Sequence, residues 1–185
     1  MPRLCRLAVT ALVFCVVSLA NQGLAQDNPD ACLLFTDADA SALFQETVSP
    51  GVARAAITPA GNSCRYFYDK NGDAFGMSLT YCTDASIAQE GIFDSVADVM
   101  MRQLRARQNS AHASTLLIVM PGLGDEAFWD GTSLWMRKGG HLVIIKPSPH
   151  LASSFASMEA ADAAKAERSR ELAVQAAEII LPRLP

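Results

Sequence analysis

The stretch that decides the fold is residues 116–146, LLIVMPGLGDEAFWDGTSLWMRKGGHLVIIK. It predicts an apolar strand, a second strand in the segment GLGDEAFW that opens at Gly122, and a hairpin closed by Gly139-Gly140. Glycine pairs between alternating segments favour primed two-residue turns, which need positive φ angles at the centre. Such a turn pairs Met136 with Val143, Leu134 with Ile145 and Lys138 with His141 on one face, and Trp135 with Ile144 and Arg137 with Leu142 on the other.

A second hairpin is expected earlier in the chain, with strands over 63–69 and 75–83. A type I′ turn at Asn71-Gly72 fixes its register. Side chains alternate between the two faces of a strand, so the register decides which residues share a face. One face is apolar and pairs Cys64 with Leu79, Tyr66 with Met77 and Tyr68 with Phe75; the other carries Arg65, Phe67, Gly76, Ser78, Thr80 and Cys82.

Three helices are expected around these strands. Thr36 precedes two acids and predicts an N-cap for a helix over 37–45. A second helix is predicted within 84–108, where apolar residues recur at helical spacing, and a third over the alanine-rich residues 158–181. With a further strand over 52–57, the order α-βββ-α-βββ-α predicts an α+β fold. Its antiparallel sheet should have about five to six strands and flanking helices.

The N-terminus has the layout of a secretory signal peptide. Arg3 and Arg6 precede an apolar run over 7–19 and the small-residue site Gly23-Leu24-Ala25. We expect cleavage after Ala25, which leaves residues 26–185 as a single domain in the periplasm or outside the cell. The alternative is an uncleaved anchor, but the apolar run is short for a spanning helix. We therefore expect no stable membrane span after cleavage.

Charge excludes one class of partner. Residues 1–25 contain two arginines and no acid, so their removal changes the formal net charge from −4 to −6. An acidic domain lacks the basic surface of a nucleic-acid-binding protein.

Three cysteines remain after cleavage, Cys32, Cys64 and Cys82. In an oxidising compartment two of them should pair. Cys64 lies on the apolar face that a helix should cover and Cys32 lies just before the first helix, which favours Cys32–Cys64. A Cys32–Cys82 pair is the alternative.

The sequence offers no recognisable catalytic motif. Gly122-Leu123-Gly124-Asp125 lacks the spacing of a phosphate loop. The three histidines lack metal-ligand spacing, and no serine stands in a nucleophile elbow. We therefore expect no catalytic residue, no metal and no cofactor. Asp125, Glu126 and Asp130 are the carboxylates that could act as acid/base groups or hold a hard cation. The alternative is a hydrolase-like or metal-assisted enzyme that uses Asp125, Glu126 or a histidine.

A binding surface is the remaining candidate. If both hairpins share one sheet, aromatic, aliphatic and arginine side chains gather on the face away from Cys64, a mixture that is enriched at interfaces and pockets. The competing interpretation is that a helix covers this face as ordinary core. We expect a non-enzymatic binding or accessory domain whose partner is a small apolar ligand, a peptide or an envelope protein. The candidate residues are Arg65, Phe67, Trp135, Arg137, Leu142 and Ile144.

Several segments carry a family resemblance. They are ACLLFTDAD at 31–39, SCRY at 63–66, GLGDEAFW at 122–129 and LWMRKG at 134–139. Together they resemble the helix start, the Cys-x-Tyr strand and the glycine hairpin of a group of small secreted bacterial proteins of unknown function. That group includes actinobacterial lipoproteins and is similar to extracellular sensor domains of mycobacterial-type kinases. The resemblance implies a helix-flanked antiparallel sheet, a Cys32–Cys64 bridge and no catalytic residues. This chain lacks the lipidation cysteine of the lipoproteins, so the resemblance does not imply membrane anchoring.

Overall fold

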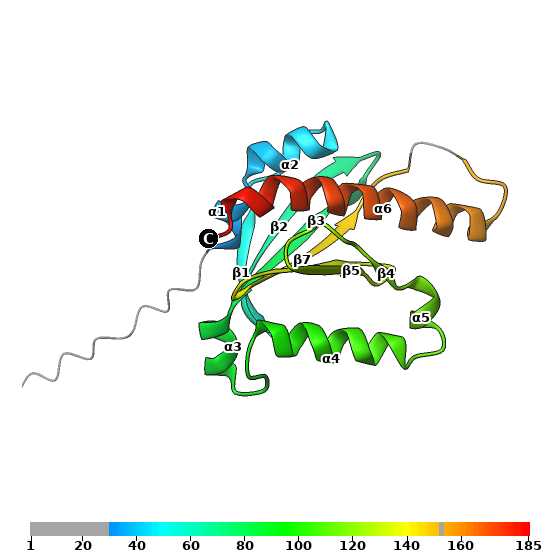
Figure 1. The fold of residues 1–185 in the computed structure, drawn as a ribbon. Coiled ribbons are helices and arrows are strands. Elements are labelled where there is room, and N and C mark those ends of the chain that lie inside the picture. Colours follow the sequence, from blue (N-terminus) through cyan, green and yellow to red (C-terminus); the bar gives the residue numbers. More distant parts are fainter. Residues whose placement is uncertain (1–29, 152–153) are drawn as a thin grey trace, which may run out of the picture.

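Seven antiparallel strands form one sheet in the computed structural model, which describes residues 30–151 and 154–185 (Figure 1). The order across the sheet is β1-β2-β3-β7-β6-β5-β4. The expected signal peptide lies outside the described residues. The α+β class is as expected, but the strand count is higher because the second half contributes four strands rather than three. The strands are β1 (Val52–Ile57), β2 (Ala60–Lys70), β3 (Asp73–Thr83), β4 (Ile118–Val119), β5 (Glu126–Trp129), β6 (Leu134–Lys138) and β7 (His141–Ser148).

Both hairpin registers are confirmed. β2 and β3 pair Cys64 with Leu79, Tyr66 with Met77 and Tyr68 with Phe75, and β6 and β7 make all the expected pairs. Asn71 and Gly72 both have positive φ, 59° and 87°. In the second turn Gly139 alone has positive φ, 55°, so the expectation of two left-handed glycines there was wrong.

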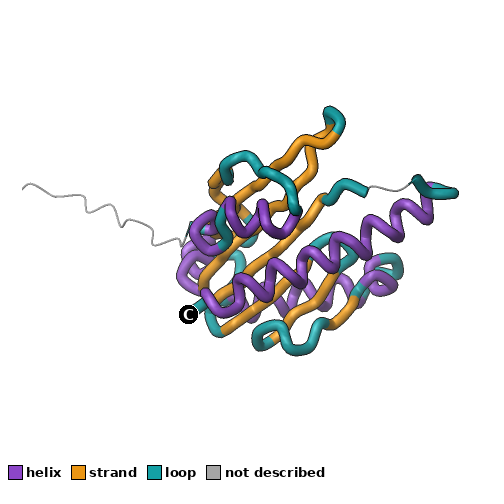
Figure 2. The backbone as a smooth tube through the Cα atoms, turned by 90° about the horizontal axis from the view of Figure 1, so that it is seen from above, coloured by secondary structure: helices purple, strands orange, loops and turns teal. Residues whose placement is uncertain are grey.

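Helices cover both faces of the sheet (Figure 1). On one face lie α1 (Ala31–Leu34), α2 (Asp37–Phe44) and α6 (Met158–Ile180), and Figure 2 shows α2 beside α6 when the molecule is seen from above. On the other face lie α3 (Asp84–Glu90) and α4 (Val96–Gln108). Two short elements complete the fold, α5 (Ala113–Leu116) and the 3₁₀ turn η1 (Leu181–Arg183). Within the described ranges no helix has the length and apolar character needed to cross a membrane.

The helix predicted within 84–108 is two helices. Gly91 ends α3 in the left-handed conformation, with φ 74°, and its N–H bonds to the carbonyl of Ile87. A glycine at this position is the usual helix C-cap. The chain then restarts at Ser95, whose side chain caps α4. This break allows α3 to pack beside β2 and β3 while α4 packs under β6.

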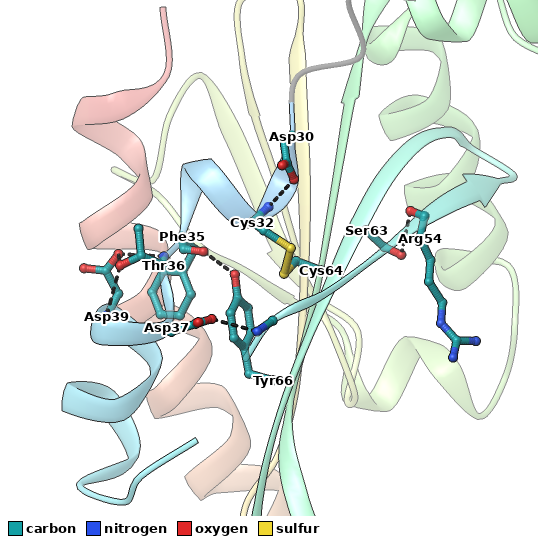
Figure 3. Close-up of a disulfide and its surroundings, with 11 residues drawn as sticks. Asp30, Cys32, Phe35, Thr36, Asp37, Asp39, Arg54, Ser63, Cys64 and Tyr66 are labelled. Atoms are coloured by element: carbon teal, nitrogen blue, oxygen red, sulfur yellow. Dashed lines mark hydrogen bonds between the residues drawn. A yellow bond between two sulfur atoms is a disulfide. The ribbon is translucent and has the colours of Figure 1, made fainter. Parts of the chain in front are cut away.

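The two faces hold separate cores. The larger core lies under α1, α2 and α6 and includes Tyr66, Leu79, Met136 and Ile145. The smaller core lies under α3 and α4. The disulfide joins Cys32 of α1 to Cys64 of β2 on the larger-core face, as expected (Figure 3). Cys82 is a free cysteine, buried on the other face. The sheet therefore presents two chemically different sides.

Candidate functional site

The six candidate residues share one face of the sheet, as the registers require. Arg65 stands opposite Ser78, and Phe67 stands opposite Gly76 on the neighbouring strand. Ile144 of β7 stands between Thr80 of β3 and Trp135 of β6. This is the face away from the disulfide.

Helix α4 covers one half of this face. Trp135 is 8% exposed and Leu142 is fully buried, in a cluster with Val96, Val99 and Met100. The structure thus divides the expected surface. Trp135 and Leu142 are core residues, as in the competing interpretation of a covered face, and Ile144 packs half-buried against the same cluster.

A charged group fixes α4 to the sheet. Asp130 accepts hydrogen bonds at one oxygen from Arg107 Nη2 at 2.6 Å and from Trp135 Nε1 at 2.9 Å. Its other oxygen accepts the backbone N–H groups of Thr132 and Ser133. Burial alone would raise the pKa of Asp130, but these hydrogen bonds outweigh it and lower the pKa. The Arg107 guanidinium also lies 4.8 Å from the Trp135 ring centre, as in a cation–π contact.

Arg137 is held at the far end of the face. Its Nε lies 2.7 Å from Glu126 and its Nη1 lies 3.1 Å from Asp125. Asp125 also accepts the Gly139 N–H at 2.7 Å, which links the 122–125 loop to the hairpin turn. Asp125 precedes β5, and Glu126 is the first residue of that strand. Asp125, Glu126 and Asp130 all have structural partners here.

Away from α3 and α4, part of the same face is covered by no helix of the described residues. β1, β2, β3 and the end of β7 lie side by side there, and their registers align Val52, Arg65, Ser78 and Lys146 in one row across the strands. The next row contains Phe67, Gly76 and Ser148. We call this surface the open half-face and define it as Val52, Arg54, Arg65, Phe67, Gly76, Ser78, Lys146 and Ser148.

A hollow of about 330 Å³ opens on this surface. Its lining includes Arg65, Phe67, Ser78, Lys146 and Ser148, together with Gly76. A Cβ atom at Gly76 would lie 1.9 Å from the backbone oxygen of Tyr66. Only glycine fits there, so the position opposite Phe67 carries no side chain.

The open half-face is basic. Arg54 projects on the side opposite the disulfide in Figure 3, next to Ser63, whose hydroxyl donates to the Arg54 carbonyl. In the part of the chain that the structure describes, Arg54, Arg65 and Lys146 form no ion pair. Sequence reasoning did not select Arg54, Ser78, Lys146 or Ser148 as site residues, because the β1–β2 and β3–β7 pairings were not assigned. The charged residue after the apolar run at 142–145 was the available signal for Lys146.

A second hollow, about 320 Å³, lies between α4 and the 119–126 segment. Phe128 separates it from Trp135, since the two rings stack with centres 5.9 Å apart. Its apolar lining includes Met100, Leu104, Val119, Met120 and Leu123.

The histidines make ring contacts instead of forming a cluster. His141 Nδ1 lies 2.8 Å from the Tyr81 hydroxyl, and the two rings stack. His150 packs edge-on against Phe75. Among residues 30–151 and 154–185, no group of three His, Cys, Asp or Glu side chains is arranged to hold a metal ion.

The described residues therefore form an α+β fold in which a disulfide joins α1 to β2 and helix α4 covers part of one sheet face. Comparisons with protein-family models, with curated proteins and with solved structures give no match for this chain.

Proposed function

We propose that this protein is an exported, non-enzymatic binding domain and that the open half-face is its ligand surface. The observation that carries the proposal is an exposed hollow that combines Phe67, 42% exposed, with Arg65 and Lys146, which form no ion pair with any described residue. Pockets that bind ligands combine apolar walls with a few polar groups that fix orientation. On the covered half, α4 packs over Trp135 and Leu142, so these two side chains belong to the core.

Two further features support the proposal. The Cys32–Cys64 disulfide is typical of an oxidising compartment, which agrees with the signal peptide predicted at 1–25. The carboxylates considered for an enzyme, around Asp125, are engaged in holding Arg137.

The test is native mass spectrometry of the protein isolated from its own compartment. We expect an added mass on the wild-type chain that is absent from Phe67→Ser. The matched control is Ile57→Ser, which removes an exposed aliphatic side chain from the other face of β1 and should keep the added mass. An added mass that survives Phe67→Ser, or no added mass at all, contradicts the proposal. One equivalent of bound metal in elemental analysis would favour the enzyme alternative instead.

A further inference from the structure

We infer that the open half-face binds an amphiphilic anion, a carboxylate or phosphate head with an apolar chain. The head group sits between Arg65 and Lys146 above Ser78, and the chain lies along Phe67. This inference rests on the proposed function, because it names the ligand class of the same surface.

The head-group position follows from the row across the strands. Arg65 pairs with Ser78, and Ser78 pairs with Lys146. Neighbouring strands lie about 4.8 Å apart, so the backbones of Arg65 and Lys146 are about 10 Å apart with Ser78 between them. A guanidinium and an ammonium on flexible stems can both reach one anion over Ser78, and the serine hydroxyl adds a third donor.

The chain position follows from the neighbouring row. Phe67 stands opposite Gly76, which has no side chain, and the next residue across is Ser148. The ring therefore borders the hollow rather than packing against a partner side chain of β3. This arrangement leaves a slot beside the ring with an apolar wall and a small polar side chain at its far end.

Charge complementarity selects an anion. Seven of the thirteen Lys and Arg residues in the described chain form ion pairs, and three of the other six are Arg54, Arg65 and Lys146. The chain as a whole is acidic, with a net charge of −4. A cluster of unpaired cations in an acidic protein creates a local positive potential that attracts an anionic ligand.

The number of cations on the open half-face favours a single amphiphile over a membrane surface as the ligand. Basic clusters that bind anionic lipid surfaces usually contain about four to eight Lys or Arg residues. The open half-face has three, and two of them, Arg65 and Lys146, line a hollow of about 330 Å³. That volume suits one small ligand.

The experiment is a ¹H–¹⁵N NMR titration of the exported protein with sodium octanoate. Octanoate should shift the Gly76 and Ser78 amides saturably. Acetate, which has the head without the chain, and octylammonium, which has the chain with the opposite charge, should each bind at least tenfold more weakly. Octyl phosphate distinguishes a phosphate head from a carboxylate head.

Variants then test each part of the site. Arg65→Ala and Lys146→Ala should each weaken octanoate binding about tenfold, as expected for the loss of one charge-assisted hydrogen bond. Phe67→Ala should make octanoate bind no better than acetate. Lys165→Ala, an exposed lysine on α6, is the charge-matched control and should bind as wild type.

The inference is overturned if octanoate shifts no amide of the open half-face, or if octylammonium binds equally well. Binding only to vesicles that contain phosphatidylglycerol would replace it with a membrane-surface role. If octanoate fails while the native added mass still depends on Phe67, the proposed function stands and only the ligand class is wrong.

Discussion

The carboxylate of Asp130 links α4 to the sheet, and the part of the sheet face under α4 is core. Its side chain is 7% exposed and it accepts hydrogen bonds from α4, from Trp135 and from its own turn. A buried carboxylate is costly unless its oxygens are satisfied. Here both oxygens are satisfied, and the same contacts hold Arg107 over the Trp135 ring.

Asp130→Asn should lower the free energy of unfolding by about 2–3 kcal/mol, because it leaves the mostly buried Arg107 without a counter-ion. Urea unfolding monitored by tryptophan fluorescence measures this loss. Glu167→Gln, which removes the acid of an exposed pair with Arg170 on α6, is the control and should be nearly neutral. Equal effects of the two substitutions would show that Asp130 does not fix α4.

Cys82 is a free thiol that the fold protects. It is fully buried, its Sγ lies 3.7 Å from the Pro59 carbonyl, and burial, with a smaller contribution from Glu90, raises its pKa to about 12. Relative to the ordinary value of 9.0, this lowers the thiolate fraction about a thousandfold at pH 8.

Cys82 should therefore resist iodoacetamide at pH 8 in the native protein, because the thiolate is the reactive form. In denaturant without reductant it should accept one label per chain, counted by mass spectrometry. Labelling of the native protein at the rate of the denatured one would mean that the thiol is accessible. Cys82→Ser is the control and should accept no label in either state.

Among the secondary-structure elements, the hairpin turns could be predicted from the sequence. The pairing of strands that are far apart in the sequence could not. Asn71-Gly72 and Gly139 specify turns whose geometry depends on adjacent residues, so both hairpin registers could be derived from the sequence. The sequence does not show that β7 inserts beside β3, which alone brings Lys146 into line with Arg65. The sequence therefore predicted only two residues of the open half-face, Arg65 and Phe67, as site residues.

The apolar stripe that begins at Phe93 predicted one helix within 84–108, and α4 is that helix. The separate helix α3 before Gly91 was not predicted. The left-handed conformation of Gly91 divides that segment, and the division allows α4 to cover Trp135. The periodicity of apolar residues could not show that α4 covers Trp135. An apolar strand face has the same sequence pattern whether a helix or a ligand packs on it. The role of Trp135 depended on tertiary packing.

The disulfide ties α1, a single helical turn, to β2 across 32 residues of sequence. On the chain-entropy account a closed loop of this length stabilises the fold by roughly 3–4 kcal/mol. Cys32→Ser/Cys64→Ser should lower the free energy of unfolding by about that amount in urea titrations.

Reduction with dithiothreitol supplies the control for this prediction. It should shift the urea midpoint of the wild-type protein and leave that of the double variant unchanged. A wild-type midpoint that does not move on reduction would contradict a stabilising role for the bond.

Across the molecule as a whole, α1, α2 and the C-terminal segment close the larger core together. Arg183 of η1 donates to the Leu34 carbonyl at 3.0 Å and forms two hydrogen bonds with Asp39 of α2. Lys138 of β6 donates to the Leu184 carbonyl at 2.8 Å. The C-terminal segment is thus fixed both to the N-terminal helices and to the sheet, on the side away from the open half-face.

This closure should depend on pH through Asp39. The hydrogen bond from Arg183, with further bonds from Thr36, outweighs burial and holds the pKa of Asp39 well below its ordinary value of 3.8. A carboxylate with a lowered folded-state pKa stabilises the fold above its unfolded pKa, and that stabilisation is lost as the pH falls below about 4 toward the folded pKa.

Arg183→Met should therefore cost about 1 kcal/mol at pH 7, a figure reduced for solvent screening because Arg183 is partly exposed. The cost should shrink as the pH is lowered from 4 toward 2, because Asp39 takes up a proton in the unfolded chain over this range, which cancels part of the stabilisation that its pair with Arg183 provides. Urea midpoints measured across this range for both proteins give the difference directly. Arg168→Met, which breaks an exposed pair with Glu171 on α6, is the control and should show a smaller cost at pH 7. If the free energies of unfolding of the wild type and Arg183→Met differ by the same amount from pH 7 to pH 2, the charge of Arg183 does not join η1 to α2. Packing of the Arg183 stem would then account for the contact.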